Sequence, residues 1–126
     1  MLPKFFALLL FVSLNALAAS PAELLAGYTA QSGQPANAAK GETFFKASHG
    51  QEWQCTSCHG KSPMVGGRHA STDKAIEPLA PATNVKRFTD SAKVEKWFRR
   101  NCKDVLAREC TATEKADVLA WLMTLR

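Results

Sequence analysis

The C-terminal third of the chain carries apolar residues at the spacing of an α-helix. Five large side chains form the stripe: Val118, Leu119, Trp121, Leu122 and Leu125. Thr111, followed three residues later by Glu114, is a capping-box signature for the start of such a helix. The pattern predicts a helix from about residue 112 to residue 125.

A second helical pattern precedes it, over residues 92–102, with Asp90 or Ser91 as its N-cap. One face, spaced i, i+3, i+4 and i+7, consists of Val94, Trp97, Phe98 and Asn101. The opposite face is basic and consists of Lys96, Arg99, Arg100 and Lys103. The apolar face therefore ends in an amide, which needs a partner if it is buried. A helix cap or a backbone hydrogen bond is the simplest such partner.

The N-terminal half of the chain shows weaker patterns. Helices are expected over residues 21–28 and 36–46, with a break at residues 33–35. Between residues 61 and 81 Gly, Pro and Ser predominate, which predicts a long loop with little regular structure. A loop of this length in a small domain is usually functional or wrapped around something. Because no strand-like alternation is evident, we predict an all-α fold of three to five helices.

The first residues have the pattern of an export signal. Lys4 precedes an apolar run from residue 5 to residue 17, and Ala16-Leu17-Ala18 has the form of an A-x-A cleavage site. The run is shorter than the roughly 20 residues of a membrane-spanning helix. We therefore predict a signal peptide over residues 1–18 and one mature domain over residues 19–126. In a bacterium, export of this kind leads to the periplasm, an oxidising compartment.

The charge and the cysteine content narrow the class further. The 126 residues include 16 Lys and Arg and 11 Asp and Glu, a formal net charge of +5. The basic residues do not form the blocks typical of a nucleic-acid binder, so no nucleic-acid partner is expected. Cys102 and Cys110, two of the four cysteines, flank a short segment between the last two predicted helices. Export favours a disulfide between them, worth roughly 2–3 kcal/mol on the chain-entropy model.

The other two cysteines carry the most specific signal in the chain, Cys55-Thr56-Ser57-Cys58-His59. This C-x-x-C-H spacing is typical of c-type haem attachment: Cys55 and Cys58 form thioethers with the haem vinyl groups, and His59 ligates the iron. Zinc would need a second ligand pair at similar spacing, and a redox dithiol would follow a strand; neither is evident. The single motif predicts one covalently attached haem c.

The ligand on the other side of the iron decides what such a protein does. A methionine well downstream is typical of an electron carrier. Met64 follows the haem motif too closely to cross the haem easily, and Met123 fits the core side of the last helix. His69 and His49 are possible ligands, although each is more simply explained as a surface or hydrogen-bonded histidine. Asn101 is the remaining candidate, and the helical pattern alone favours a cap or a backbone hydrogen bond for its amide.

Several segments between residues 41 and 122 together form a second, longer sequence signature. They are Gly41-Glu42-Thr43-Phe44-Phe45, Trp53, His69, Lys74-Ala75-Ile76-Glu77-Pro78-Leu79-Ala80-Pro81, Arg87-Phe88-Thr89-Asp90, Lys93-Val94-Glu95-Lys96-Trp97-Phe98-Arg99-Arg100-Asn101-Cys102 and Cys110. Together with the haem motif, these segments resemble the sphaeroides haem proteins, high-spin monohaem cytochromes that bind oxygen. The resemblance implies a class I cytochrome c fold, with helices packed around one covalently attached haem.

The resemblance also implies a role for the amide. In that family an asparagine ligates the oxidised iron and a disulfide follows it. Carried over, the ligand is Asn101 and the bridge joins Cys102 to Cys110. A neutral amide oxygen is a hard, weak-field ligand that suits ferric iron and is held poorly by ferrous iron. Reduction is therefore expected to release Asn101, so that ferrous iron binds O2 or NO.

Two other functions stay open on the sequence. One is a plain periplasmic electron carrier with a permanent sixth ligand, either His69 or a methionine. The other is a low-turnover peroxidase or NO-reducing enzyme, but no pair of acid and base residues requires such chemistry, and we predict no enzymatic activity. The expected partners are O2 or NO and a redox partner, another cytochrome in the periplasm or the membrane. Basic residues such as Lys93 and Lys96 could dock an acidic partner of this kind.

Overall fold

The computed structural model describes Met1 and residues 18–126, so the predicted signal peptide lies almost entirely outside the described residues. In residues 18–126 the elements are α1 (Pro21–Ser32), α2 (Ala38–Lys46), α3 (Cys55–His59), β1 (Gly67–Arg68), β2 (Ala75–Ile76), α4 (Ser91–Leu106) and α5 (Ala112–Thr124). The mostly helical content confirms the predicted fold class. None of these helices is long and apolar enough to cross a membrane.

Two helices extend beyond their predicted ends. α1 begins with a capping box between Ser20 and Glu23 and continues to Gly33, whose φ of 71° ends it in the left-handed region. α4 continues past residue 102 because the buried Val105 extends its apolar face by one more turn. Ala107, with a φ of 56°, then ends α4. The predicted helix ended at residue 102, because its apolar face was taken to end at Asn101, and the prediction missed the last turn of α4.

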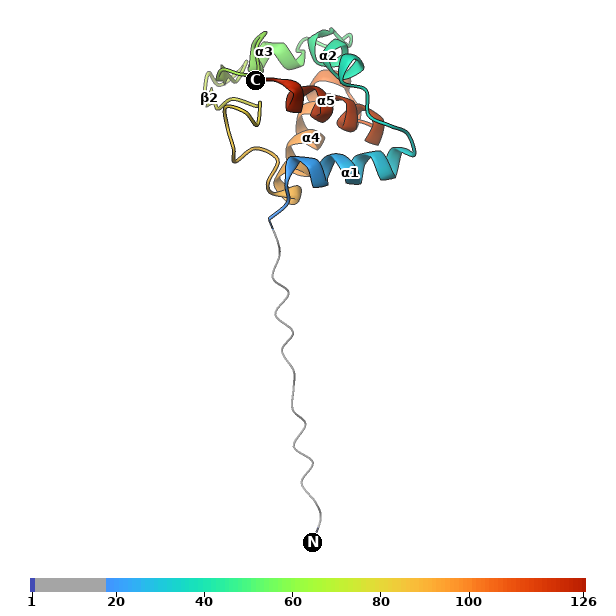
Figure 1. Ribbon diagram of the computed structural model, residues 1–126. Coiled ribbons are helices and arrows are strands. Elements are labelled where there is room, and N and C mark those ends of the chain that lie inside the picture. Colours follow the sequence, from blue (N-terminus) through green and yellow to red (C-terminus); the bar gives the residue numbers. More distant parts are fainter. Residues whose placement is uncertain (2–17) are drawn as a thin grey trace.

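α5 lies at the centre of the fold. In Figure 1 it runs through the middle of the molecule, with α1 on one side and α2 on the other. Its buried residues are Ala116, Asp117, Val118, Leu119, Trp121 and Leu122. All of these except Asp117 form the hydrophobic core together with Tyr28 of α1, Phe45 of α2 and Phe88, and Met123 packs against this core. The predicted apolar stripe of α5 is therefore the centre of the core.

α2 and α5 approach each other most closely at Gly41. A Cβ atom on this residue would lie 1.9 Å from the carbonyl oxygen of Asp117, so no larger residue fits. The Asp117 side chain is only 6% exposed and accepts a hydrogen bond of 2.6 Å from the backbone N–H of Asn37. Asn37 is the N-cap of α2, so this hydrogen bond attaches the beginning of α2 to α5.

The long loop predicted after the haem motif contains a small hairpin that the sequence did not indicate. β1 and β2 pair antiparallel, with two residues in each strand. Beyond the hairpin, the loop is tied to itself by polar contacts. The carbonyl oxygen of Pro63 accepts two backbone hydrogen bonds of 3.0 Å from the chain after β2. Arg87 donates to the carbonyl oxygens of Glu77 and Pro78, at 2.8 and 2.9 Å.

The contact at Gly41 predicts a large difference between two glycine substitutions. Gly41→Ala forces a methyl group into the α5 backbone and is expected to lower the free energy of unfolding by about 1–3 kcal/mol. Gly27→Ala, on α1, meets nothing within 4 Å and is expected to raise it by roughly 0.5–1 kcal/mol through helix propensity. Denaturant unfolding of the mature protein measures both values. Equal effects at the two positions would contradict the close approach.

Candidate haem site

The residues of the haem motif form the single helical turn α3. Cys55, Cys58 and His59 are spaced i, i+3 and i+4, which places them on one side of the turn. The backbone N–H of Gln54 donates to the Ser57 hydroxyl at 3.0 Å and so orders the start of the turn. Both cysteines are free thiols and partly buried. A helical turn thus presents two thiols and an imidazole together.

His59 lies beside the core. The centroids of its ring and of the Phe45 ring are 6.0 Å apart, and Phe45 in turn packs on Trp121 at 5.1 Å. Burial, with a smaller contribution from the positive charge of Arg87, lowers the pKa of His59 to about 4. Burial also raises the pKa of the Cys55 thiol to about 11. At neutral pH the imidazole is therefore uncharged, which is the form that ligates a metal.

Part of the loop packs directly against Cys58. A Cβ atom on Gly67 would lie 1.9 Å from the Cys58 carbonyl oxygen, so β1 contacts the backbone of α3. The backbone N–H of Ala70 donates to the Cys58 sulfur at 3.3 Å. The loop therefore lies beside the Cys58 thiol, as expected if it wraps around a group bound at α3.

The two histidines considered as sixth ligands both have other partners. Nδ1 of His69 accepts hydrogen bonds of 3.3 Å from the backbone N–H groups of Ser71 and Thr72, which leaves the proton of the neutral ring on Nε2. In this tautomer Nε2 has no free lone pair for a metal. Nε2 of His49 donates a hydrogen bond of 2.8 Å to the carbonyl oxygen of Phe44, and the centroids of the two tilted rings are 4.5 Å apart. The arrangement of His69 therefore does not favour iron ligation, whereas the hydrogen bond of His49 holds its ring beside Phe44 of α2.

The face of α4 predicted from the sequence divides into a buried and an exposed part. Val94 and Phe98 pack against the core, whereas Trp97 is 41% exposed and Asn101 is exposed. Asn101 does not cap the helix, because α4 continues to Leu106. Within the described part of the chain its amide makes no hydrogen bond to protein. The simplest role expected from the pattern, a cap or a backbone hydrogen bond, is therefore wrong.

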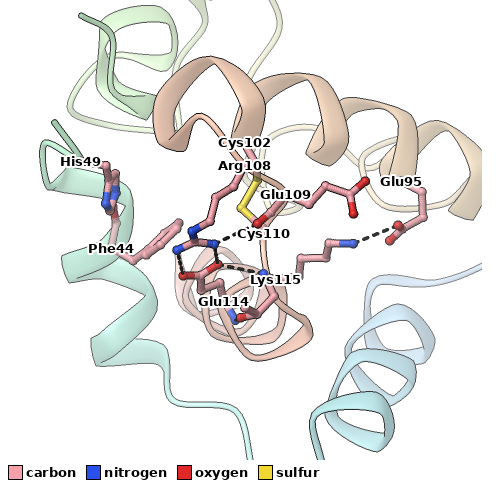
Figure 2. The surroundings of a disulfide bond; sticks show 10 residues. Phe44, His49, Glu95, Cys102, Arg108, Glu109, Cys110, Glu114 and Lys115 are labelled. Carbon is pink, nitrogen blue, oxygen red and sulfur yellow. Dashed lines mark hydrogen bonds and ion pairs between the residues drawn. A yellow bond between two sulfur atoms is a disulfide. The ribbon is translucent and has the colours of Figure 1, made fainter. Parts of the chain in front are cut away.

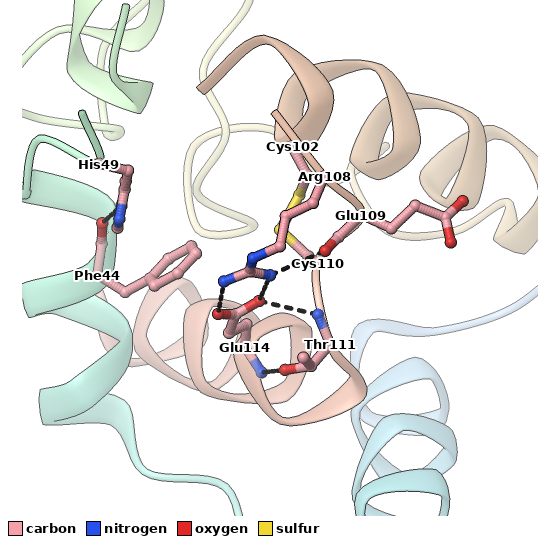
Figure 3. A network of polar contacts seen from close by, with 8 residues as sticks. All are labelled: Phe44, His49, Cys102, Arg108, Glu109, Cys110, Thr111 and Glu114. Atoms are coloured by element: carbon pink, nitrogen blue, oxygen red, sulfur yellow. Dashed lines mark hydrogen bonds and ion pairs between the residues drawn. A yellow bond between two sulfur atoms is a disulfide. The ribbon is translucent and has the colours of Figure 1, made fainter. Parts of the chain in front are cut away.

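A disulfide joins Cys102, the residue after Asn101, to Cys110, with 5.6 Å between their Cα atoms. Figure 2 shows this bridge linking the end of α4 to the start of α5. Figure 3 shows Arg108 beside it, donating two hydrogen bonds of 2.9 and 2.8 Å to the Glu114 carboxylate. Glu114 also accepts from the backbone N–H of Thr111 at 2.8 Å, completing the capping box of α5. The backbone next to Asn101 is thus held on its C-terminal side.

The donor set of α3 fits a haem better than a bare metal ion. In residues 18–126 no three His, Cys, Asp or Glu side chains are grouped so that they could hold an ion. Two thiols and one neutral imidazole on a helical turn suit a cofactor that is bound covalently and brings its own equatorial nitrogens. Trp97 and the partly exposed Val94 and Phe98 of α4 supply apolar surface of the kind that such a flat, apolar group packs against.

Comparison with known proteins agrees with this donor set. Residues 31–122 match a family model described as a domain of unknown function, DUF1924. The chain is 49% identical over 107 residues to the cytochrome c-type protein SHP of Cereibacter sphaeroides, covering 82% of each protein. It is 46% identical over 80 residues to cytochrome c'' of Methylophilus methylotrophus, covering 64% of this chain and 56% of that protein.

Solved structures show the same relationship. The fold is similar to that of oxidised SHP, an oxygen-binding cytochrome c, with a TM-score of 0.81 and 47% identity over 86% of this chain and 99% of that one. For oxidised cytochrome c'' of M. methylotrophus the TM-score is 0.72 and the identity 38%, over 84% and 94% of the two chains. The class is therefore that of the c-type cytochromes. Within it, the chain belongs to the family of the cytochrome c-type protein SHP, as the sequence resemblance indicated.

The network beside the disulfide predicts a specific loss of stability in acid. The hydrogen bonds from Arg108 outweigh burial and hold the pKa of Glu114 below its usual value of 4.5. Because the carboxyl titrates lower in the folded than in the unfolded chain, its stabilisation is complete above pH 4.5 and is lost as the pH falls below it. Glu114→Gln is expected to make the melting temperature less dependent on pH in this range.

Thermal unfolding of the haem-loaded protein at a series of pH values measures this dependence. Glu52→Gln removes an exposed carboxyl from the segment before α3 and serves as the control. It is expected to keep the pH dependence of the unaltered protein. A curve for Glu114→Gln that coincides with the control would show that the Arg108–Glu114 pair does not stabilise the fold.

Proposed function

We propose that the chain is an exported monohaem c-type cytochrome that binds a diatomic gas in its reduced state. Cys55 and Cys58 hold one haem covalently, and His59 ligates the iron. In the oxidised protein Asn101 ligates the iron on the opposite side. Reduction releases Asn101, and O2 or NO binds in its place. The protein carries electrons and binds gas, and it catalyses no reaction of its own.

The hydrogen bonding, packing and exposure of the candidate ligands support this proposal. Nδ1 of His69 and Nε2 of His49 are each engaged by a hydrogen bond, and Met123 packs against the core. Asn101 lies exposed on a face of α4 whose neighbouring residues are apolar. An exposed amide at the end of an apolar face, next to a disulfide, is an arrangement suited to ligating a metal. The description of the solved relative as an oxygen-binding cytochrome c supports the gas-binding part.

Haem iron supplies one-electron redox chemistry and, when ferrous, an axial position for a diatomic ligand. The residues of the chain determine when that position is free. The amide oxygen of Asn101 is neutral and hard, so it prefers ferric iron and releases ferrous iron. A methionine sulfur would remain bound in both states, which suits a permanent electron carrier. The identity of the residue that ligates the iron opposite His59 therefore distinguishes a gas-binding cytochrome from a permanent electron carrier.

The proposal includes export and a redox partner. A signal peptide over residues 1–18 would direct a mature domain of residues 19–126 to the periplasm, and the Cys102–Cys110 disulfide fits an oxidising compartment. The partner is another cytochrome with an acidic surface, in the periplasm or the membrane. α4 exposes a set of basic residues that would attract it: Lys93, Lys96, Arg100 and Lys103. Charge complementarity of this kind raises the rate of encounter.

The decisive experiment compares oxidised and reduced spectra of the haem-loaded protein with those of Asn101→Ala. The oxidised spectrum of the variant is expected to change to that of an open or water-ligated iron. Both reduced proteins are expected to be high-spin and to bind carbon monoxide rapidly. An oxidised spectrum that is unaffected by Asn101→Ala would show that another residue ligates the iron.

Two further variants test the electron-carrier alternative. His69→Gln and Met64→Leu remove the remaining side chains that could complete the coordination from the loop. Both variants are expected to keep the oxidised spectrum and the carbon monoxide binding of the unaltered protein. A low-spin ferrous spectrum that ignores carbon monoxide, and that either variant abolishes, would identify a permanent sixth ligand and overturn the gas-binding function.

A further inference from the structure

Three helices meet at the carboxylate of Glu95 on α4. The hydroxyl of Tyr28, on α1, donates to Oε1 of Glu95, and Nζ of Lys115, on α5, donates to Oε2 at 2.9 Å. Lys115 also lies over the rings of Tyr28 and Phe98, at 5.5 and 5.8 Å from their centroids. The Tyr28 and Phe98 rings meet edge to face at 5.9 Å. We call these four residues the Glu95 cluster; Figure 2 shows its Lys115–Glu95 contact.

The Glu95 cluster is polar but well satisfied. Tyr28 is only 4% exposed, and each carboxylate oxygen of Glu95 has a donor. Burial alone would raise the pKa of Glu95, but the hydrogen bonds from Tyr28 and Lys115, together with the charges of Lys115 and Arg99, hold it below its usual value. Burial and the contact with Glu95 raise the pKa of Tyr28 well above 10. Glu95 is therefore ionised and Tyr28 protonated across the neutral range.

These contacts give α4 a directional attachment that its apolar residues do not. Burial of Val94 and Val105 stabilises the packing, but hydrophobic contacts are non-directional and fix neither the rotation nor the height of a helix. The Glu95 hydrogen bonds fix both. Asn101 lies six residues beyond Glu95, about 9 Å along the helix axis. Since Cys102 is tied to α5 by the disulfide, Asn101 lies between two fixed points of the same helix.

We infer that Glu95 is a positioning residue for Asn101, acting through Tyr28 and Lys115. This inference rests on the proposed function, in which the Asn101 amide ligates oxidised iron. The two attachments hold the α4 backbone in one place in both oxidation states, so the amide leaves by side-chain rotation and finds the same position again on reoxidation. Loosening the Glu95 cluster spreads the amide over more positions and weakens its ligation of the ferric form.

The sign of the effect on the reduction potential follows from this. Ligation by Asn101 stabilises the oxidised protein, so weaker ligation raises the potential. A tenfold weakening of the amide corresponds to about 59 mV for a one-electron couple. Tyr28→Phe is the sharpest variant, because it removes one hydrogen bond, keeps the ring in the core and changes no charge at neutral pH.

The test measures the reduction potential and the oxidised spectrum of the haem-loaded Tyr28→Phe and Glu95→Gln proteins. Both variants are expected to raise the potential by tens of millivolts, on the scale of one tenfold step, and to shift the ferric spectrum towards that of Asn101→Ala. Asp117→Asn is the control: it also converts a carboxylate that links two helices to an amide, but its partner is the N-cap residue of α2. It is expected to lower stability and to leave the ferric spectrum unchanged.

The same two variants in the Asn101→Ala background separate positioning from a general effect of charge or stability. There they are expected to shift the potential no further, because no amide is left to position. An equal shift with and without Asn101 would overturn the role of the Glu95 cluster and leave the proposed function intact. An oxidised spectrum insensitive to Asn101→Ala alone would overturn the proposed function and, with it, this inference.

Discussion

The contact between Gly41 and the carbonyl group of Asp117 brings α2 and α5 together, and the other elements are placed relative to that pair. α2 carries Phe45, whose ring lies between Trp121 of α5 and the imidazole of His59. The single turn α3 is therefore positioned from the α2 side. α4 is positioned from the α5 side, through the disulfide and through Lys115. α3 and α4, which carry the two halves of the proposed haem site, are thus both positioned relative to α5.

Local signals in the sequence predicted much of the fold. The capping box at Thr111, the apolar stripe of α5 and the break at Gly33 each act within a few residues, so a pattern reveals them. The hairpin was missed because its four residues are too few to show alternation. The end of α4 was missed because Val105 lies beyond the amide that was taken as the end of the apolar face. The family relationship was predicted from the motifs and is confirmed.

In the candidate site, too, local features could be predicted from the sequence and longer-range contacts could not. The motif residues Cys55, Cys58 and His59 were identified from spacing alone, and their roles remain predictions. The contacts around the candidate ligands join residues far apart in the sequence or depend on a histidine tautomer. Tyr28 and Glu95 are separated by 67 positions in the sequence, and no periodicity relates them. The hydrogen bonds to Nδ1 of His69 come from a turn whose geometry the sequence does not specify.

The burial of the disulfide has a consequence for cysteine pairing in the folded protein. Cys102 is 4% exposed once α4 and α5 have packed, whereas Cys55 and Cys58 stay partly exposed. Once the chain has folded, an oxidant or reductant reaches this pair only from the side of Cys110, which is partly exposed. The thiols of α3 remain partly accessible in the folded chain. In the folded chain the buried Cys102 sulfur is thereby kept from the partly exposed thiols of Cys55 and Cys58, which limits mispairing between the two cysteine pairs.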